Sequence, residues 1–195
     1  MHTPSDRLRR RSLLALATMS LVTASSARSG PVRPPTGWVE PPEAMPPLQV
    51  TDTAGRQLSL ANAMAGKVTA VQLMFTGCSS VCPVQGALFA EMARRMRGAD
   101  VRWLSVSIDA LGDTPGALAA WQDRFGRSPA WKALVPAAAE VTRLTDFIEG
   151  TAIKHGTHTA QVFVFDREAR LVYRTADSPS VDDLEALLTH FVRRG

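Results

Sequence analysis

The sequence predicts an α/β domain built on a mixed central sheet that is flanked by helices. Two observations carry this prediction. Apolar runs typical of buried strands alternate with amphipathic segments along the chain, and patterns typical of β-hairpins come before and after them. Strands joined through helices pair in parallel, whereas hairpin strands pair antiparallel, so the sheet has to be mixed. With 195 residues, of which 45% are hydrophobic, the chain is long enough for one such domain.

The first 27 residues have the three-part pattern of an export signal. Three consecutive arginines at 9–11 precede an apolar run at 12–22, and small residues follow as far as Ala27. The run is too short to span a bilayer comfortably, although an uncleaved signal would tether the protein to the inner membrane. Residues 10–14 also resemble the twin-arginine pattern, which leaves the export route open. We therefore expect a periplasmic or otherwise exported protein.

The distribution of charge does not support a nucleic-acid partner. The chain carries a net charge of +4. Four arginines and one aspartate place +3 of this charge in the first 27 residues, which leaves +1 for the rest of the chain. A nucleic-acid-binding domain would instead concentrate Lys and Arg on its own surface.

The composition of the segment after the signal is typical of a linker. Residues 28–47 contain seven prolines and little apolar pattern, which is typical of an extended connection. We therefore place the folded domain at residues 48–195 and expect it to be monomeric.

The domain is expected to begin with a hairpin and a buried strand. Residues 48–60 form two short alternating segments around the turn Ala54-Gly55. Residues 68–75 are almost continuously apolar, which is typical of a strand buried on both faces. An amphipathic helix follows, with Pro83 in its first turn, where the missing N–H costs nothing. The apolar residues that define this helix recur every four positions: Val84, Leu88, Met92 and Met96.

The later elements are predicted from the same signals. Residues 101–108 predict the next strand, and Pro115 opens a helix that Asp113 or Thr114 caps. The rest comprises a short strand at 131–135, a helix at 137–148, a hairpin of 161–165 with 170–174, and a final helix capped by Ser180.

The two cysteines of the chain lie between the buried strand and the helix that follows it. Cys78 and Cys82 are separated by three residues, so both sulfurs are expected near the positive N-terminal end of that helix. This placement predicts a reactive dithiol or a site for a soft metal. A structural disulfide is the alternative in an exported protein, but so small a loop gains little stability from chain entropy.

Other candidate groups have simpler interpretations. Asp109 and Asp113 are close enough in the sequence to suggest paired carboxylates, but one ends a strand and the other caps a helix, which favours structural roles. Met74, Met92 and Met96 could ligate a soft metal, yet their spacing is that of core residues.

Three motifs in order resemble the Sco/SenC family over residues 45–193. They are the cysteine segment at 76–83, the run at 105–109 followed by 113–115, and His158-Thr159 ahead of a strand that ends in Asp166. A strand followed by a cysteine pair at a helix mouth is also the thioredoxin-like arrangement, although thioredoxin-type enzymes have two residues between their cysteines. The resemblance therefore implies a thioredoxin-like fold.

The resemblance also implies a copper protein whose ligands are Cys78, Cys82 and His158. Thiolates select Cu(I), and imidazole accepts either oxidation state, so Cu(II) binding stays open. Two sulfurs and one nitrogen suit copper better than structural zinc, which usually has four protein ligands. His155 is an alternative ligand. The sequence departs from the common family pattern at three positions: Ser79, Ala110 and Thr157.

Three functions fit this site. The first is a copper metallochaperone that helps to assemble the copper centre of cytochrome c oxidase, with the copper-centre subunit or another exported copper protein as its partner. The second is an enzyme, a thiol-disulfide oxidoreductase in which Cys78 attacks and Cys82 resolves the mixed disulfide. The third is a redox or copper sensor, in which the state of the site changes a docking surface.

Overall fold

The structure, a computed structural model, describes residues 35–149 and 159–194. The predicted export signal and the predicted ligand His158, together with His155, lie outside these ranges. Within the described part of the chain, no helix has the length and apolar character needed to cross a membrane.

The centre of the domain is a mixed sheet, as the sequence predicts, and it has eight strands. Its strand order is β1-β8-β7-β4-β5-β6-β2-β3. The three central strands β4, β5 and β6 run parallel, and every other pairing is antiparallel. The strands are β1 (Gly37–Ala44), β2 (Gln49–Asp52), β3 (Gln57–Ser59), β4 (Val68–Met74), β5 (Val101–Ser107), β6 (Trp131–Pro136), β7 (Phe163–Phe165) and β8 (Arg170–Arg174).

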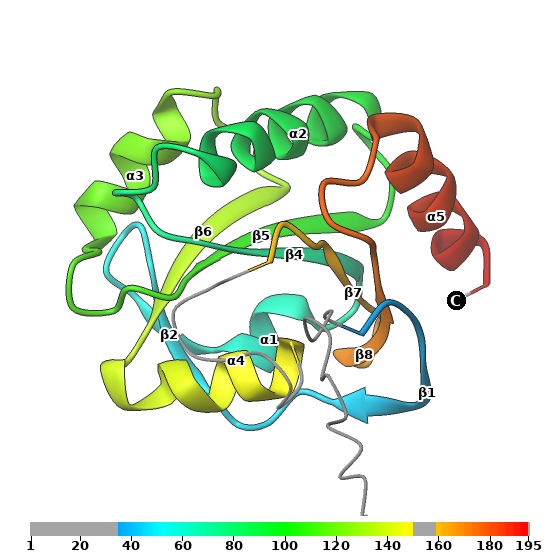
Figure 1. The fold of residues 1–195 in the computed structure, drawn as a ribbon, viewed down its shortest axis with the longest axis horizontal. Coiled ribbons are helices and arrows are strands. Elements are labelled where there is room, and N and C mark those ends of the chain that lie inside the picture. Colours follow the sequence, from blue (N-terminus) through cyan, green and yellow to red (C-terminus); the bar gives the residue numbers. More distant parts are fainter. Residues whose placement is uncertain (1–34, 150–158, 195) are drawn as a thin grey trace, which may run out of the picture. The chain divides into compact units, whose positions relative to one another are not determined.

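Helices cover both faces of the sheet (Figure 1). One apolar core lies under α2, α3 and α5, and a second lies under α1 and α4. The helices are α1 (Leu60–Met64), α2 (Val81–Arg95), α3 (Pro115–Asp123), α4 (Val141–Glu149) and α5 (Val181–Arg194), with a 3-10 turn, η1 (Ala138–Glu140), before α4. All seven residues of β4 are buried, which confirms the strand predicted to be buried on both faces.

The structure corrects the predicted linker. Residues 28–47 were expected to be an extended connection, but Gly37–Ala44 form β1 and pair with β8 at the edge of the sheet. Pro41 and Pro42 lie where the register of this pairing shifts, between Trp38 and Glu43. Proline lacks the N–H that a central strand needs, so its tolerance here depends on the edge position and the irregular register. That tertiary setting is invisible in the local sequence.

The short helix α1 and the packed face of α2 also differ from expectation. Helix α1 has five residues, too few to show a helical period in the sequence. Val84 was predicted to face the core, but it is 64% exposed. The buried residues of α2 are instead Cys82, Gln85, Gly86, Phe89, Met92 and Ala93.

Gly86 explains why this face of α2 packs so closely. A Cβ atom at this position would lie 2.7 Å from the ring of Phe125 and 3.0 Å from that of Trp121. Both distances are shorter than van der Waals contact, so only a residue without a side chain lets α2 approach α3 this closely.

We predict that Gly86→Ala destabilises the protein. Overpacking costs about 1–3 kcal/mol, which exceeds the gain of about 1 kcal/mol from replacing a helical glycine by alanine. The net loss should reach about 2 kcal/mol in the free energy of unfolding, measured with urea. Gly116→Ala is the matched control, because the nearest atom to its Cβ would be 3.9 Å away. An unchanged free energy for Gly86→Ala would show that Phe125 moves aside without cost.

Candidate metal and dithiol site

The turn from β4 to α2 brings the two cysteines together. Cys78 lies in this turn, where its backbone N–H donates to the carbonyl of Phe75 at 3.1 Å, and Cys82 is the second residue of α2. Ser80 precedes the helix but makes no side-chain cap. The N–H of Cys82 instead donates to Sγ of Cys78 at 3.5 Å. Because the first amides of a helix lack partners within it, the Cys78 sulfur takes the position of a capping acceptor.

The two thiols differ in accessibility. Within the described structure, neither cysteine takes part in a disulfide. Cys78 is half-buried and reachable from solvent, whereas Cys82 is fully buried within the core under α2. The predicted pair is therefore brought together, with one sulfur at the surface and one behind it.

The two thiols also differ in acidity. Burial opposes ionisation of Cys78, but hydrogen bonds from the backbone and side chain of Cys82 and from Ser80 outweigh it and lower the Cys78 pKa from 9.0 to about 6. Burial raises the pKa of Cys82 to about 12, and the nearby negative charges of Cys78 and Asp113 act in the same direction. At pH 7 the site therefore holds an accessible thiolate beside a buried thiol, which suits both metal binding and nucleophilic attack.

Asp113 supports the site in a way that the sequence did not reveal. Its buried carboxylate accepts hydrogen bonds from the backbone N–H of Thr76 at 3.1 Å, from the hydroxyl of Thr76, and from Oγ of Ser107 at 2.7 Å. Asp113 therefore ties the chain that leads to Cys78 to the end of β5. Of the two caps that the sequence allowed, the structure shows Thr114, whose Oγ1 accepts from the N–H of Ala117, so the capping role expected for Asp113 is wrong. A pattern of local caps could not show a contact made across 37 residues.

The third predicted ligand, His158, is not part of the described structure. Among the residues that are described, no group of three or more His, Cys, Asp or Glu side chains is placed to hold a metal ion. The two cysteines are thus observed side by side, and the three-ligand set stays a prediction. Met74 and Met92 are fully buried, in agreement with their predicted packing role.

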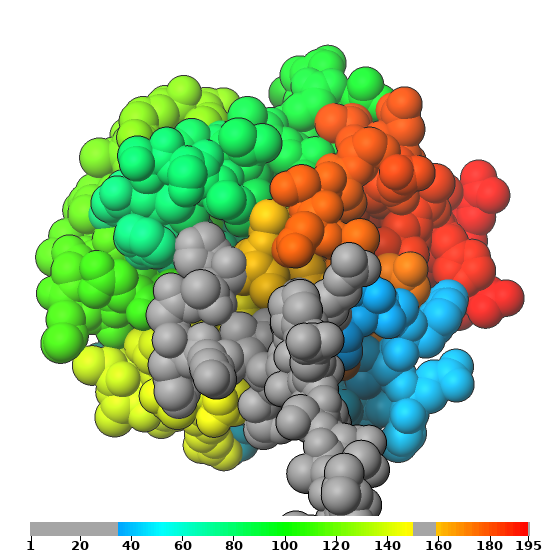
Figure 2. All heavy atoms as spheres, in the orientation of Figure 1, coloured from blue at the N-terminus to red at the C-terminus, as the bar shows by residue number. Residues whose placement is uncertain are grey.

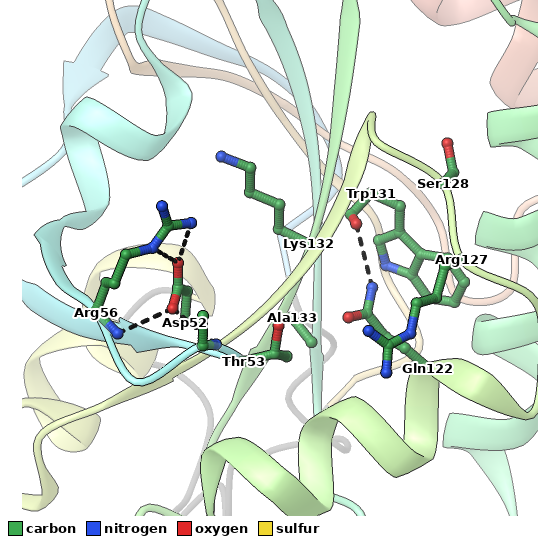
Figure 3. Close-up of a pocket in the computed structure, with 10 residues that line it drawn as sticks. Asp52, Thr53, Arg56, Gln122, Arg127, Ser128, Trp131, Lys132 and Ala133 are labelled. Carbon is green, nitrogen blue, oxygen red and sulfur yellow. Dashed lines mark hydrogen bonds and ion pairs between the residues drawn. The ribbon is translucent and has the colours of Figure 1, made fainter.

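A cavity of about 160 Å³ lies elsewhere in the domain (Figure 3). The residues that line it include no cysteine or histidine. Its buried carboxylate, Asp52, accepts from two backbone amides and pairs with Arg56 at 2.8 Å. The guanidinium of Arg127 is engaged by Asp123. These charges are already satisfied within the domain.

A mixed sheet with a cysteine pair between its central strand and the next helix defines a thioredoxin-like dithiol protein. The sequence profile of the SCO1/SenC family matches residues 39–193. The chain belongs to the SCO1/SenC family, which confirms the resemblance seen in its motifs.

Solved structures agree with this fold. A SCO1/SenC family lipoprotein from Bacillus anthracis matches with a TM-score of 0.69 and 19% identity, covering 78% of this chain and 98% of its own. Bradyrhizobium japonicum ScoI with copper bound matches with a TM-score of 0.63 and 24% identity, covering 76% of this chain and 99% of its own. BsSco, described as a member of the Sco family of cytochrome c oxidase assembly proteins with a disulfide switch, matches with a TM-score of 0.64 and 17% identity, covering 77% of this chain and 94% of its own. The search of curated sequences found no significant match.

We predict that Cys78 reacts with iodoacetamide as a thiolate of low pKa. Its alkylation rate, followed by peptide mass spectrometry, should rise through pH 6 and level off above pH 7, because the thiolate is then fully formed. Ser80→Ala should move this profile to higher pH, since Ser80 donates to the thiolate. A rate that rises only above pH 8 would contradict the hydrogen-bonded thiolate.

We predict that Asp113→Ala lowers the free energy of unfolding by about 1–3 kcal/mol, because the Thr76 amide and the Ser107 hydroxyl lose their acceptor. Urea denaturation measures the effect. Asp109→Ala is the control, since Asp109 is exposed and its carboxylate accepts from the nearby amide of Gly112. Equal losses in the two variants would refute a special role for Asp113.

Proposed function

We propose that this protein binds one copper ion through Cys78, Cys82 and His158 and passes it to an exported metalloprotein, such as the copper-centre subunit of cytochrome c oxidase. The observation that carries this proposal is the thiolate of Cys78 beside Cys82 at the start of α2, in a chain of the SCO1/SenC family. The family comprises copper-binding proteins of cytochrome c oxidase assembly, and copper is bound in the related ScoI structure.

The donor set suits this cargo. Thiolate sulfur is a soft ligand that selects Cu(I), and an imidazole nitrogen accommodates both Cu(I) and Cu(II). The accessible position of Cys78 allows the ligands of a partner to share the copper ion before Cys82 releases it. Transfer would therefore proceed by ligand exchange at the surface thiolate.

The protein is proposed to act outside the cytoplasm, where an N-terminus left uncleaved would tether it to the inner membrane. The export pattern at residues 1–27 supports this location. N-terminal sequencing of the protein from a membrane and a soluble fraction would distinguish the tethered form from the cleaved form.

An anaerobic Cu(I) titration of the reduced protein against a competing chelator tests the ligand set. Cys78→Ser and Cys82→Ser should abolish tight binding, and His158→Ala should weaken it by at least about 10–100-fold, the range found when a group that only orients a metal ligand is lost. His190→Gln is the control, because His190 lies on α5 among the aromatic rings of Trp38 and Phe191. His155→Ala tests the alternative ligand. Unchanged affinity in all the cysteine and His158 variants would refute the proposal.

The acidity of the two thiols predicts how copper affinity depends on pH. Between pH 7.5 and 8.5, Cys78 is already ionised and only Cys82 loses a proton when copper binds. The Cu(I) affinity should therefore rise about tenfold per pH unit. Competition titrations at the two pH values measure this slope. A rise of about a hundredfold would mean that both thiols enter the reaction protonated.

The same asymmetry favours a second function, reduction of a partner disulfide. The Cys78 thiolate would attack one sulfur of the partner and release the other as a thiolate. Cys82 would then attack Cys78, leaving a Cys78–Cys82 disulfide and a reduced partner, and a second dithiol would have to reduce the pair again. Cys82→Ser should trap the mixed disulfide with a candidate copper protein, whereas Cys78→Ser should not. No trapped species with either variant would count against this function.

A further inference from the structure

The chain immediately after His158 is held by several separate hydrogen bonds. The N–H of Thr159 donates to Oε1 of Glu149 at 3.1 Å, at the end of α4. The N–H of Ala160 donates to Oδ1 of Asp177 at 2.7 Å. Two further hydrogen bonds join Val162 to Thr175. The N–H of Val162 donates to Oγ1 of Thr175 at 2.8 Å, and the N–H of Thr175 donates to the carbonyl of Val162 at 3.0 Å. Residues 159–162, which we term the anchored run, are thus fixed from more than one side before β7 begins.

Gln161 is the centre of the anchored run. Its side chain is fully buried, and its Nε2 donates to the carbonyls of Thr175 at 2.7 Å and Pro35 at 3.0 Å. Its own carbonyl accepts a hydrogen bond from Nε2 of Gln85 at 3.3 Å. The last of these contacts comes from the helix that carries Cys82.

Gln85 connects the cysteine helix directly to the anchored run. It lies on α2 three residues after Cys82, so the two side chains are on the same buried face of the helix. Figure 2 shows the residues just after 158, coloured orange-yellow, against the green surface of α2. Gln85 is 2% exposed.

Burying an amide side chain at this position costs free energy. Gln85 lies on the face of α2 that otherwise contacts the core, where an apolar side chain would need no partner. Only one end of the amide is used, because its Oε1 is buried without a hydrogen-bond partner among the described residues. Gln85 therefore adds little to the free energy of unfolding. Its main effect is to fix the distance between α2 and Gln161.

We propose that Gln85 is a positioning residue for the copper site. It holds the anchored run at a set distance from the cysteine helix. This inference rests on the proposed function, because it requires His158, three residues before Gln161 in the sequence, to be the third ligand. Gln85 acts through the chain that bears the histidine and does not touch copper itself.

The test is a double-mutant cycle on Cu(I) affinity with the full protein. Gln85→Met removes the hydrogen bond at nearly the same volume and should weaken binding about tenfold, the lower end of the range for groups that orient metal ligands. In the His158→Ala background, the same change should cause no further loss, because the ligand it positions is gone. The EPR spectrum of the Cu(II)-loaded Gln85→Met protein should show weaker nitrogen hyperfine coupling, which a purely structural role would not produce.

Gln122→Met is the matched control. Gln122 is also a buried glutamine on a helix, and its Nε2 donates to the carbonyl of Trp131 at 3.2 Å, beside the cavity of Figure 3. This variant loses the same kind of hydrogen bond away from the cysteines, so its copper affinity should equal that of the natural sequence. Gln85→Glu is a second variant should Gln85→Met fail to fold. It places a carboxylate against the Gln161 carbonyl and should also weaken binding.

The outcomes separate this inference from the proposed function. If His158→Ala leaves copper affinity unchanged, the three-ligand proposal fails and the role of Gln85 fails with it. If His158→Ala weakens binding but the folded Gln85 variants do not, only the role of Gln85 is refuted. Equal effects of Gln85→Met with and without His158, or an equal effect of Gln122→Met, would show a general loss of structure and also refute it.

Discussion

The burial of β4 on both faces is the constraint on which the rest of the structure depends. Because all seven of its residues are packed between two apolar cores, the strand cannot shift or turn without exposing one of them. The chain leaves β4 at Met74 and enters α2 at Val81, so the position of the turn that carries Cys78 follows from the position of the strand. The reactive sulfur thus lies on a short connection between two rigid elements.

Helix geometry then makes the two thiols unequal. The start of α2 directs the backbone amide of Cys82 at Cys78, which stabilises the Cys78 thiolate, while burial of the Cys82 side chain in the core opposes its ionisation. Two residues of the same type therefore take different roles because one precedes the helix and the other belongs to it. An accessible thiolate in front of a buried thiol suits both metal transfer and disulfide exchange. Which reaction occurs depends on whether the partner presents metal ligands or a disulfide.

Hydrogen bonds between residues far apart in the sequence position the segments around this dithiol. Asp113 ties the approach to Cys78 to the end of β5, and Gln85 ties α2 to the chain that enters β7. Both are buried polar groups whose hydrogen bonds span 37 and 76 residues, respectively. Such bonds contribute modestly to stability but strongly to geometry, because a buried polar group without its partner is costly.

The sequence by itself determined the order of the strands and helices from β2 onward except α1, the buried strand β4, a helix start at Pro115 and the placement of both cysteines at the mouth of α2. These features depend on local spacing and on helix-end chemistry, which are visible in neighbouring residues. Only the tertiary structure decided that proline-rich residues 37–44 form an edge strand, that Val84 faces solvent, and that Asp113 and Gln85 brace the site. The physical reason is that sheet-edge pairing, the packing of α2 against α3 at Gly86, and buried hydrogen bonds all join residues far apart in the chain.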